Sequence, residues 1–216
     1  MTEFPILQFG ASRFLQAHVD LFVSEALPRG QAMGRIAVVG TTGSPESRRR
    51  IAAFTAGQPY PVLVKGLSDG AVVNETVEVM SVGAGVDAVT EWDELERLFV
   101  AARCAISNTA DRGYETDPDD RPDAGPPRSF PAKLAKLLLA RHRAGADPIT
   151  LFPCELTPTN GQVLRGVVLD VLDRWQAPAD ARRWVGEECI WVNSLVDRIV
   201  SEPLEPLGAV AEPYAL

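Results

Sequence analysis

An apolar run that ends on a glycine and leads directly into a helical pattern constrains the fold more than any other stretch. Residues 5–9 read Pro-Ile-Leu-Gln-Phe, and Gly10 follows them. Beyond Gly10, apolar side chains recur on one helical face, at Phe14, Ala17, Leu21 and Phe22. The pattern predicts a strand, a tight turn and a helix that continues to about Ala26. Such a turn points backbone N–H groups and the positive end of the helix dipole at one place, where a dinucleotide pyrophosphate can bind.

The glycine fingerprint of a dinucleotide-binding turn is incomplete here. Gly10 holds the first glycine place, but Ser12 stands at the second and Leu15 at the third. A serine on a strand-to-helix turn also indicates a nucleophile elbow, with His142 as the one histidine far enough along the chain to be its base. A third interpretation is a buried strand whose turn binds nothing.

A second buried strand follows, and its end bears on the choice of cofactor. Residues 35–40 are the short apolar run expected of a parallel strand buried on both faces. In dinucleotide folds an acidic residue at this strand end binds the ribose hydroxyls, whereas an arginine accommodates the 2′-phosphate. Here Thr41 and Thr42 follow the strand, and Glu46 and the arginines at 48–50 come later. The residues alone therefore leave NAD and NADP both open.

The rest of the chain mostly alternates strand and helix. Two alternating runs at 62–66 and 72–80, separated by Ser-Asp-Gly, predict an antiparallel hairpin. A short strand at 104–107 leads into Asn108 and Thr109, which are placed to meet the ribose or nicotinamide of a cofactor, although Asn108 could instead cap a helix. We expect an α/β fold with a doubly wound, mostly parallel Rossmann-type sheet and an antiparallel hairpin insertion. Residues 1–200 would form this domain, and residues 201–216 a tail without a fold of its own.

Composition excludes several classes of function. With 21 basic and 29 acidic residues, the net charge of −8 disfavours a nucleic-acid partner. The three cysteines lie far apart in apolar surroundings, which indicates reduced, buried thiols. Two histidines without metal-ligand spacing predict no metal site. No run is apolar enough for a membrane span or a signal peptide, so we expect a cytoplasmic protein.

Five sequence blocks together resemble the long-chain polyol and uronate dehydrogenases, the mannitol dehydrogenase family. They are residues 6–18, Ser107-Asn108-Thr109, Ser129–Leu134, Pro153–Leu156 with Asn160-Gly161, and Asn193–Ile199. They occur in the family's order and span nearly the whole chain. The third and fourth blocks resemble the tagaturonate reductase (altronate oxidoreductase) branch most. Ser12 departs from the family, which usually has a glycine at that place.

The resemblance implies a metal-independent oxidoreductase that uses NAD or NADP, with NAD favoured. Its substrate would be a small molecule: a sugar alcohol or an aldonate that is interconverted with its keto form, which for the aldonate is a hexuronate. The residues implied to bind the cofactor are Gly10, Ala11, Ser12, Arg13, Phe14, Thr41, Asn108 and Thr109. Asn193 is implied to stabilise the reacting carbonyl oxygen, as an oxyanion-hole donor does. We expect Asp197 and Arg198 to form an ion pair that locks their segment, with direct contact to the substrate as the alternative, and Lys133 to be structural.

Family members continue into a second, mostly helical domain that supplies a lysine as general acid/base. No lysine among the 216 residues matches that position. We therefore expect an N-terminal nucleotide-binding half that binds cofactor without turnover. The alternative is a stand-alone nucleotide-binding or regulatory module without catalysis. The sequence makes no prediction of the oligomeric state.

Overall fold

The parallel sheet predicted from the sequence forms the centre of the molecule. The computed structural model describes residues 3–109 and 113–216. Six parallel strands lie in the order β5-β2-β1-β6-β7-β8. Their bounds are β1 Ile6–Phe9, β2 Ile36–Gly40, β5 Val82–Asp87, β6 Cys104–Ser107, β7 Thr150–Pro153 and β8 Ile190–Trp191. This order, with the chain reversing direction across the sheet between β1 and β6, is that of a doubly wound Rossmann sheet and confirms the predicted fold class.

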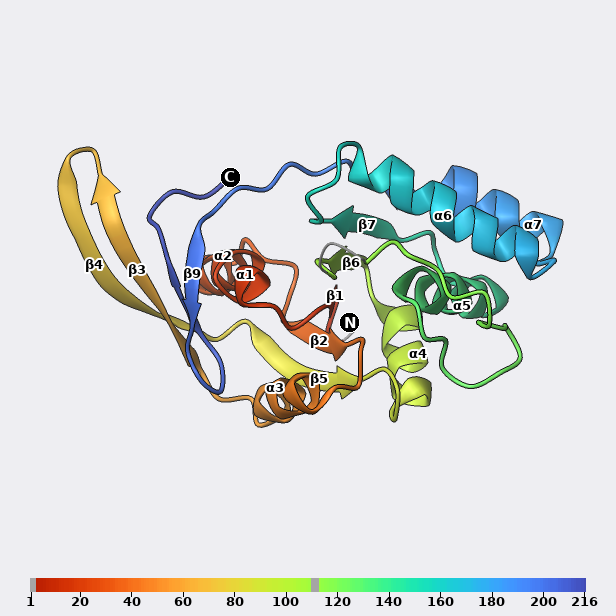
Figure 1. The fold of residues 1–216 in the computed structure, drawn as a ribbon, viewed down its shortest axis with the longest axis horizontal. Helices are drawn as coiled ribbons and strands as arrows, with labels where there is room; N and C mark the ends of the chain where they lie inside the picture. The colour runs from red at the N-terminus through yellow and green to blue at the C-terminus, as the bar shows by residue number, and fades with distance from the viewer. Residues whose placement is uncertain (1–2, 110–112) are drawn as a thin grey trace.

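Helices cover both faces of this sheet (Figure 1). The helices are α1 Arg13–Gln16, α2 Val19–Ala26, α3 Pro45–Thr55, α4 Trp92–Ala101, α5 Phe130–Arg143, α6 Asn160–Arg174 and α7 Ala179–Arg183. Alternate strand residues divide between two cores, because successive side chains of a strand point to opposite faces. Leu7 and Phe9 pack with α4, α5 and α6, whereas Ile6 and Val38 pack with α1, α2 and α3. Burial on both faces explains why these strands are continuously apolar.

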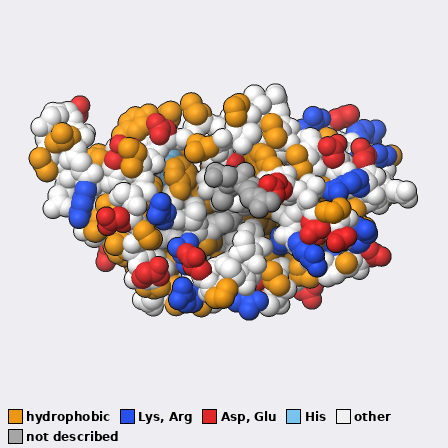
Figure 2. Space-filling model, viewed as in Figure 1, with side chains coloured by type: hydrophobic (Ala, Val, Ile, Leu, Met, Phe, Trp, Pro, Cys, Tyr) orange, Lys and Arg blue, Asp and Glu red, His pale blue; other side chains and the backbone are white. Residues whose placement is uncertain are grey.

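A second sheet of four strands lies beside the first, in the order β4-β3-β10-β9. The predicted hairpin is confirmed as β3 Tyr60–Ser68 and β4 Ala71–Val79, which pair antiparallel. Its tip projects from one end of the molecule (Figures 1 and 2). β9 Val200–Pro203 and β10 Ala209–Ala211 complete the sheet, and β10 pairs in parallel with β3. The expectation that residues 201–216 lack a fold of their own is therefore wrong.

The first helix is not continuous to Ala26 as predicted. Ala17 and His18 separate α1 from α2, and the His18 ring lies between the rings of Phe14 and Phe22, at centroid distances of 5.0 and 4.7 Å. The buried guanidinium of Arg198 donates to the carbonyl of Ala17, and also to that of Glu212. Arg198 thus stabilises the break by satisfying a carbonyl at the end of α1.

The expected ion pair between Asp197 and Arg198 is consequently not formed. The backbone of Asp197 pairs with that of Leu216 instead. Two backbone carbonyls, rather than a carboxylate, partner the buried arginine. In the described part of the chain, no helix combines the length and the apolar character needed to cross a membrane.

Candidate functional site

A cleft of about 390 Å³ lies at the carboxyl ends of β1, β2 and β6. Parallel strands end at one edge of a sheet, and the edge between β1 and β6 is where the strand order reverses, which is the usual ligand position in such folds. Six of the eight residues implied to bind the cofactor line this cleft: Gly10, Ala11, Ser12, Thr41, Asn108 and Thr109. The other two, Arg13 and Phe14, lie in α1 directly after the loop and are not among the lining residues.

Gly10 has a backbone conformation and a position that exclude any side chain. Its φ is +111°, and a Cβ atom there would lie 2.5 Å from the carbonyl oxygen of Asn108. Its N–H donates to the carbonyl of Val39 at 3.0 Å. The absence of a side chain therefore lets the turn after β1 pack directly against the end of β6.

Ser12 caps the short helix α1. Its hydroxyl accepts a hydrogen bond from the N–H of Leu15 at 3.4 Å. The buried side chain of Gln16 connects the same loop to the second sheet. Its Nε2 donates to the carbonyl of Ala11 at 3.2 Å, and its Oε1 accepts from the N–H of Gly208 at 2.7 Å. The loop is thus fixed by α1 and by the second sheet.

The nucleophile-elbow interpretation does not fit this geometry. His142 lies at the end of α5, next to Arg141, whose guanidinium donates to the carbonyls of Phe99 and Ala102, just before β6 begins. Ser12 follows the carboxyl end of β1, which is parallel to β6. Ser12 and His142 therefore lie near opposite ends of the parallel strands, so they cannot act together as nucleophile and base.

Hydroxyl groups and one ion pair form the part of the cleft next to β2. Ser44 caps α3 by accepting from the N–H of Ser47 at 3.1 Å, and Thr42 Oγ1 accepts from the N–H of Ser44 at 3.3 Å. Arg50 Nη2 lies 2.7 Å from Glu46 Oε1. This region therefore presents hydroxyls and a neutralised charge pair to a ligand.

Asn108 joins two neighbouring strand ends. Its Nδ2 donates to the carbonyl of Cys154, which follows β7, at 2.8 Å. The helix cap, the other role considered for Asn108, would involve residues 110–112, which lie outside the described residues. Its backbone carbonyl is the group against which Gly10 packs. Asn108 thus fixes the relative positions of β1, β6 and β7 at the cleft.

The buried carboxylate of Glu155 is a functional candidate that the sequence reasoning missed. Oε2 accepts from Ser107 Oγ at 3.0 Å and from the Tyr114 hydroxyl at 3.1 Å. Oε1 accepts from the backbone N–H and the hydroxyl of Thr109, at 3.1 and 3.0 Å. Burial, with the negative charge of Glu155 as a second cause, raises the pKa of Tyr114, so its hydroxyl stays a donor. The available signal was an acidic residue two positions after the short strand β7.

Asn160, also missed, holds the next loops together. It is fully buried, and its Nδ2 donates to the carbonyls of Pro153, Glu155 and Ser194 at 2.9, 3.0 and 3.0 Å. Its Oδ1 accepts from the N–H groups of Gly161 and Ser194, both at 2.9 Å. Every hydrogen-bonding group of this amide therefore has a partner. The loops after β7 and β8 are fixed as one unit.

Asn193 lies beside this unit, in a groove of about 470 Å³ that Glu155 also lines. Its side chain is exposed, and its Oδ1 accepts from the N–H of Gln162 at 3.1 Å, near the start of α6. Because the oxygen is engaged, the amide can present its Nδ2 group as a donor to the groove. Glu155 connects the groove with the cleft, because it lines the groove and its hydrogen-bond partner Thr109 lines the cleft.

The buried surroundings of Lys133 and of the three cysteines indicate structural roles for these side chains. Lys133 is 1% exposed and donates to the carbonyl of Arg128 at 2.6 Å, and burial lowers its pKa to about 8. Cys104, Cys154 and Cys189 are buried free thiols, as expected, and burial raises the pKa of each. Within residues 3–109 and 113–216, no three His, Cys, Asp or Glu side chains are grouped so that they could hold a metal ion.

Comparison with known proteins gives consistent matches over the whole chain. The family model for the Rossmann domain of mannitol dehydrogenase matches residues 5–216. Altronate oxidoreductase from Bacillus subtilis is 32% identical over 98% of the chain, and that from Klebsiella pneumoniae is 34% identical over 91%. The chain spans 45% and 41% of these two relatives, less than half of their length.

Two solved structures share the fold. D-sorbitol dehydrogenase in a substrate-free form has a TM-score of 0.82 with 20% sequence identity, over 98% of this chain and 49% of its own. The ternary complex of Pseudomonas fluorescens mannitol 2-dehydrogenase with NAD and D-mannitol has the same TM-score and identity, over 99% of this chain and 48% of its own.

Proposed function

Because the chain belongs to the mannitol dehydrogenase family, we propose that it is the nucleotide-binding half of an NAD-dependent oxidoreductase. The reaction would interconvert a sugar acid of the altronate type and its keto form. The relatives named altronate oxidoreductase support this substrate class. The observation that carries the proposal is the cleft at the switch point of the sheet, where residues after the ends of three strands meet, among them six of the residues implied to bind the cofactor.

The described residues fit a dinucleotide. Ala11 and Ser12, which follow Gly10 in the loop and line the cleft, have small side chains, so a pyrophosphate can approach the loop closely. Asn108 and Thr109 would meet the nicotinamide ribose, and Thr41 the adenosine ribose. When bound, NAD would accept a hydride at its nicotinamide ring, and NADH would donate one. The solved complex of the Pseudomonas fluorescens relative with NAD supports NAD as the cofactor.

Asn193 would bind the oxygen atom of the substrate that changes between hydroxyl and carbonyl. Its Oδ1 is engaged by Gln162, which supports a role for Nδ2 as the donor. A donor held there stabilises the negative charge that develops on this oxygen during hydride transfer. The proton itself would be handled by a lysine of the second domain, so we expect this chain to bind cofactor with no turnover. Its three buried free thiols support a reducing compartment, and we propose the cytoplasm.

Calorimetric titration of NADH into the purified chain tests the proposal. We expect saturable binding with one site per chain, and competition by ADP-ribose. The variant Asn108→Leu should weaken binding at least tenfold, since an apolar side chain loses the hydrogen bond to Cys154 that fixes the cleft. Absence of NADH binding by a chain with native circular dichroism would overturn the proposed function.

A further inference from the structure

A buried cluster of polar side chains reaches the turn after β1 from the second sheet. Gln8 comes from β1, Asp20 from α2 and Tyr60 from β3, and all three are buried. The Tyr60 hydroxyl donates to Asp20 Oδ2 at 2.7 Å. Gln8 Nε2 donates to the carbonyl of Gly10 at 3.4 Å. Since Gly10 lines the cleft, the cluster connects the second sheet with the proposed cofactor site.

The hydrogen bond from Gln8 orients the peptide unit between Gly10 and Ala11. The C=O and N–H of a trans peptide point to opposite sides, so a Gly10 carbonyl that faces Gln8 turns the Ala11 N–H away from it. Ala11 lines the cleft, and within residues 3–109 and 113–216 no carbonyl accepts from its N–H. Gln8 thus holds a backbone donor in place in the loop where a pyrophosphate would bind.

Asp20 competes with Gly10 for the same donor. Burial raises the pKa of Asp20 to about 7, and the Tyr60 hydroxyl and the Gln8 amide oppose this rise. A group that lowers the pKa of a carboxyl by hydrogen bonding donates to it, so Gln8 acts through Nε2. Asp20 Oδ1 and Gln8 Oε1 have no hydrogen-bond partner among the described residues, so Nε2 is committed to Gly10 in this structure. An ionised carboxyl would attract Nε2 more strongly than a protonated one does.

The other ionisable side chains around Asp20 leave its charge state to burial and to these two neighbours. His18 lies two residues earlier and is also buried, and burial lowers its pKa, so it is neutral where Asp20 titrates. The charged side chains of the surrounding elements are exposed: Arg13 on α1, Glu25 on α2, Arg29 after α2, Lys65 on β3, and Glu75 and Glu78 on β4.

We propose that Gln8 and Asp20 are positioning residues for the cofactor loop. With Asp20 protonated, Gln8 holds the peptide between Gly10 and Ala11 in the orientation that binds a pyrophosphate, and ionisation of Asp20 draws Gln8 away and weakens binding. The inference rests on the proposed function, because it concerns the loop of the same cleft. By linkage, the cofactor raises the proton affinity of Asp20 by the factor by which the proton raises cofactor affinity.

Titration of NADH into the purified 216-residue chain from about pH 6 to about pH 8.5, followed by fluorescence, tests this role. The wild type should lose about fivefold in affinity as the pH rises through the Asp20 pKa of about 7, since the loop loses one hydrogen bond. Asp20→Asn should keep the high affinity throughout, because an amide does not ionise. Gln8→Leu should have the low affinity at every pH. Tyr60→Phe should move the midpoint to higher pH, since it removes a hydrogen bond that lowers the pKa of Asp20.

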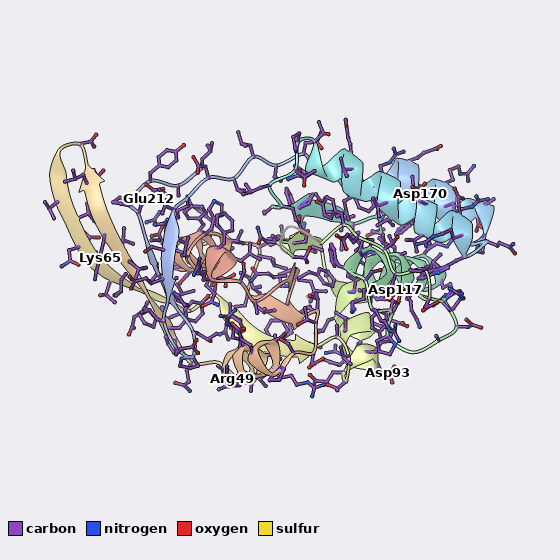
Figure 3. The ribbon with its side chains drawn as sticks, viewed as in Figure 1. Arg49, Lys65, Asp93, Asp117, Asp170 and Glu212 are labelled. Atoms are coloured by element: carbon purple, nitrogen blue, oxygen red, sulfur yellow. The ribbon has the colours of Figure 1, made fainter. Side chains whose placement is uncertain are left out.

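Asp93→Asn is the matched control, because Asp93, labelled in Figure 3, is exposed on α4 and is not among the cleft-lining residues. It should keep the wild-type profile. Carboxyl NMR measures the reciprocal effect: saturating NADH should raise the proton affinity of Asp20 about fivefold.

The outcomes separate the inference from the proposed function. A wild type that binds NADH equally well at every pH, or a natively folded Asp20→Asn variant that keeps the wild-type profile, would overturn the inference while NADH binding upholds the proposed function. Failure of the wild type to bind NADH at any pH would overturn both.

Discussion

Gly10 lies against the backbone of Asn108 so closely that a Cβ atom at residue 10 would be 2.5 Å from the Asn108 carbonyl oxygen. This contact joins the ends of β1 and β6, and the cleft lies beside it. The loop after β1 can adopt its position only because residue 10 is a glycine.

Gly10→Ala is therefore expected to cost both stability and cofactor affinity. The new methyl group would collide with Asn108 while the backbone keeps a φ of +111°, and we expect a loss of roughly 3 kcal/mol in the free energy of unfolding. Gly57→Ala is the matched control, because φ is +65° there and nothing lies within 4 Å of a Cβ atom. It should cost about 1 kcal/mol and leave NADH affinity unchanged. Urea denaturation measures the free energy of unfolding, and NADH titration measures the affinity. If Gly10→Ala and Gly57→Ala lost the same stability and the same affinity, the close approach of Gly10 to Asn108 would not explain the effect.

Asp20 should make the stability of the fold depend on pH. Its carboxyl is fully buried and accepts from the Tyr60 hydroxyl at 2.7 Å, next to Gln8, and burial raises its pKa to about 7. The folded state therefore holds a proton that the unfolded chain releases near pH 4. Between about pH 4 and about pH 7 the folded state binds more protons than the unfolded chain does. The contribution of the Asp20 carboxyl to stability therefore decreases over this range as the pH rises, by up to roughly 1.4 kcal/mol per pH unit.

Asp20→Asn removes this contribution, since an amide does not titrate and still offers an oxygen to Tyr60. Relative to the wild type, the variant should gain stability with rising pH, and the difference should level off above about pH 7. Urea denaturation in buffers from pH 4 to 8 provides the measurement. A constant difference between the two proteins across this range would refute the assignment of the titration to Asp20.

Glu155→Gln should destabilise the fold by disrupting the hydrogen bonds of Glu155 beside the cleft. Both carboxylate oxygens accept hydrogen bonds, from Ser107, Thr109 and Tyr114, so an amide nitrogen would face donors. We expect a loss of about 2 kcal/mol in the free energy of unfolding, and weaker NADH binding because Thr109 lines the cleft. Glu187→Gln, at an exposed position, should change neither. Unaltered stability of the Glu155 variant in urea would show that the hydrogen-bond network contributes little.

Arg198→Lys should loosen the second sheet from the helices. One ammonium group cannot replace a guanidinium that reaches the carbonyls of both Ala17 and Glu212. We expect a loss of about 2 kcal/mol in stability and faster proteolytic cleavage within residues 200–212. Arg49→Lys, at an exposed place on α3, is the control. Identical cleavage rates for both variants would argue against this role of Arg198.

Local patterns predicted those parts of the structure that depend on neighbouring residues. The buried strands, the hairpin and the turn at Gly10 each follow from a few consecutive residues, and the cleft follows because parallel strands end at one edge. Thr41 and Asn108 thus lie in one cleft with Gly10 although they are far apart in sequence.

The remaining features depend on contacts that no local pattern contains. The break after α1 involves Arg198, and the network of Glu155 joins residues 107 to 155. β9 and β10 are only 4 and 3 residues long and lie in a stretch interrupted by prolines, so their strand character comes from pairing in the second sheet. Asn160 is recognisable as a site residue only when its three carbonyl partners are brought together by folding.

The pairing of β3 with β10 has a consequence for synthesis of the protein in the cell. Val62 pairs with Ala209, so one edge of β3 stays without its partner until Ala209 has also left the ribosome. During that interval a nascent chain exposes an open strand edge, which can pair with another molecule. Chaperones that bind extended segments would therefore act on this hairpin before its final neighbour arrives.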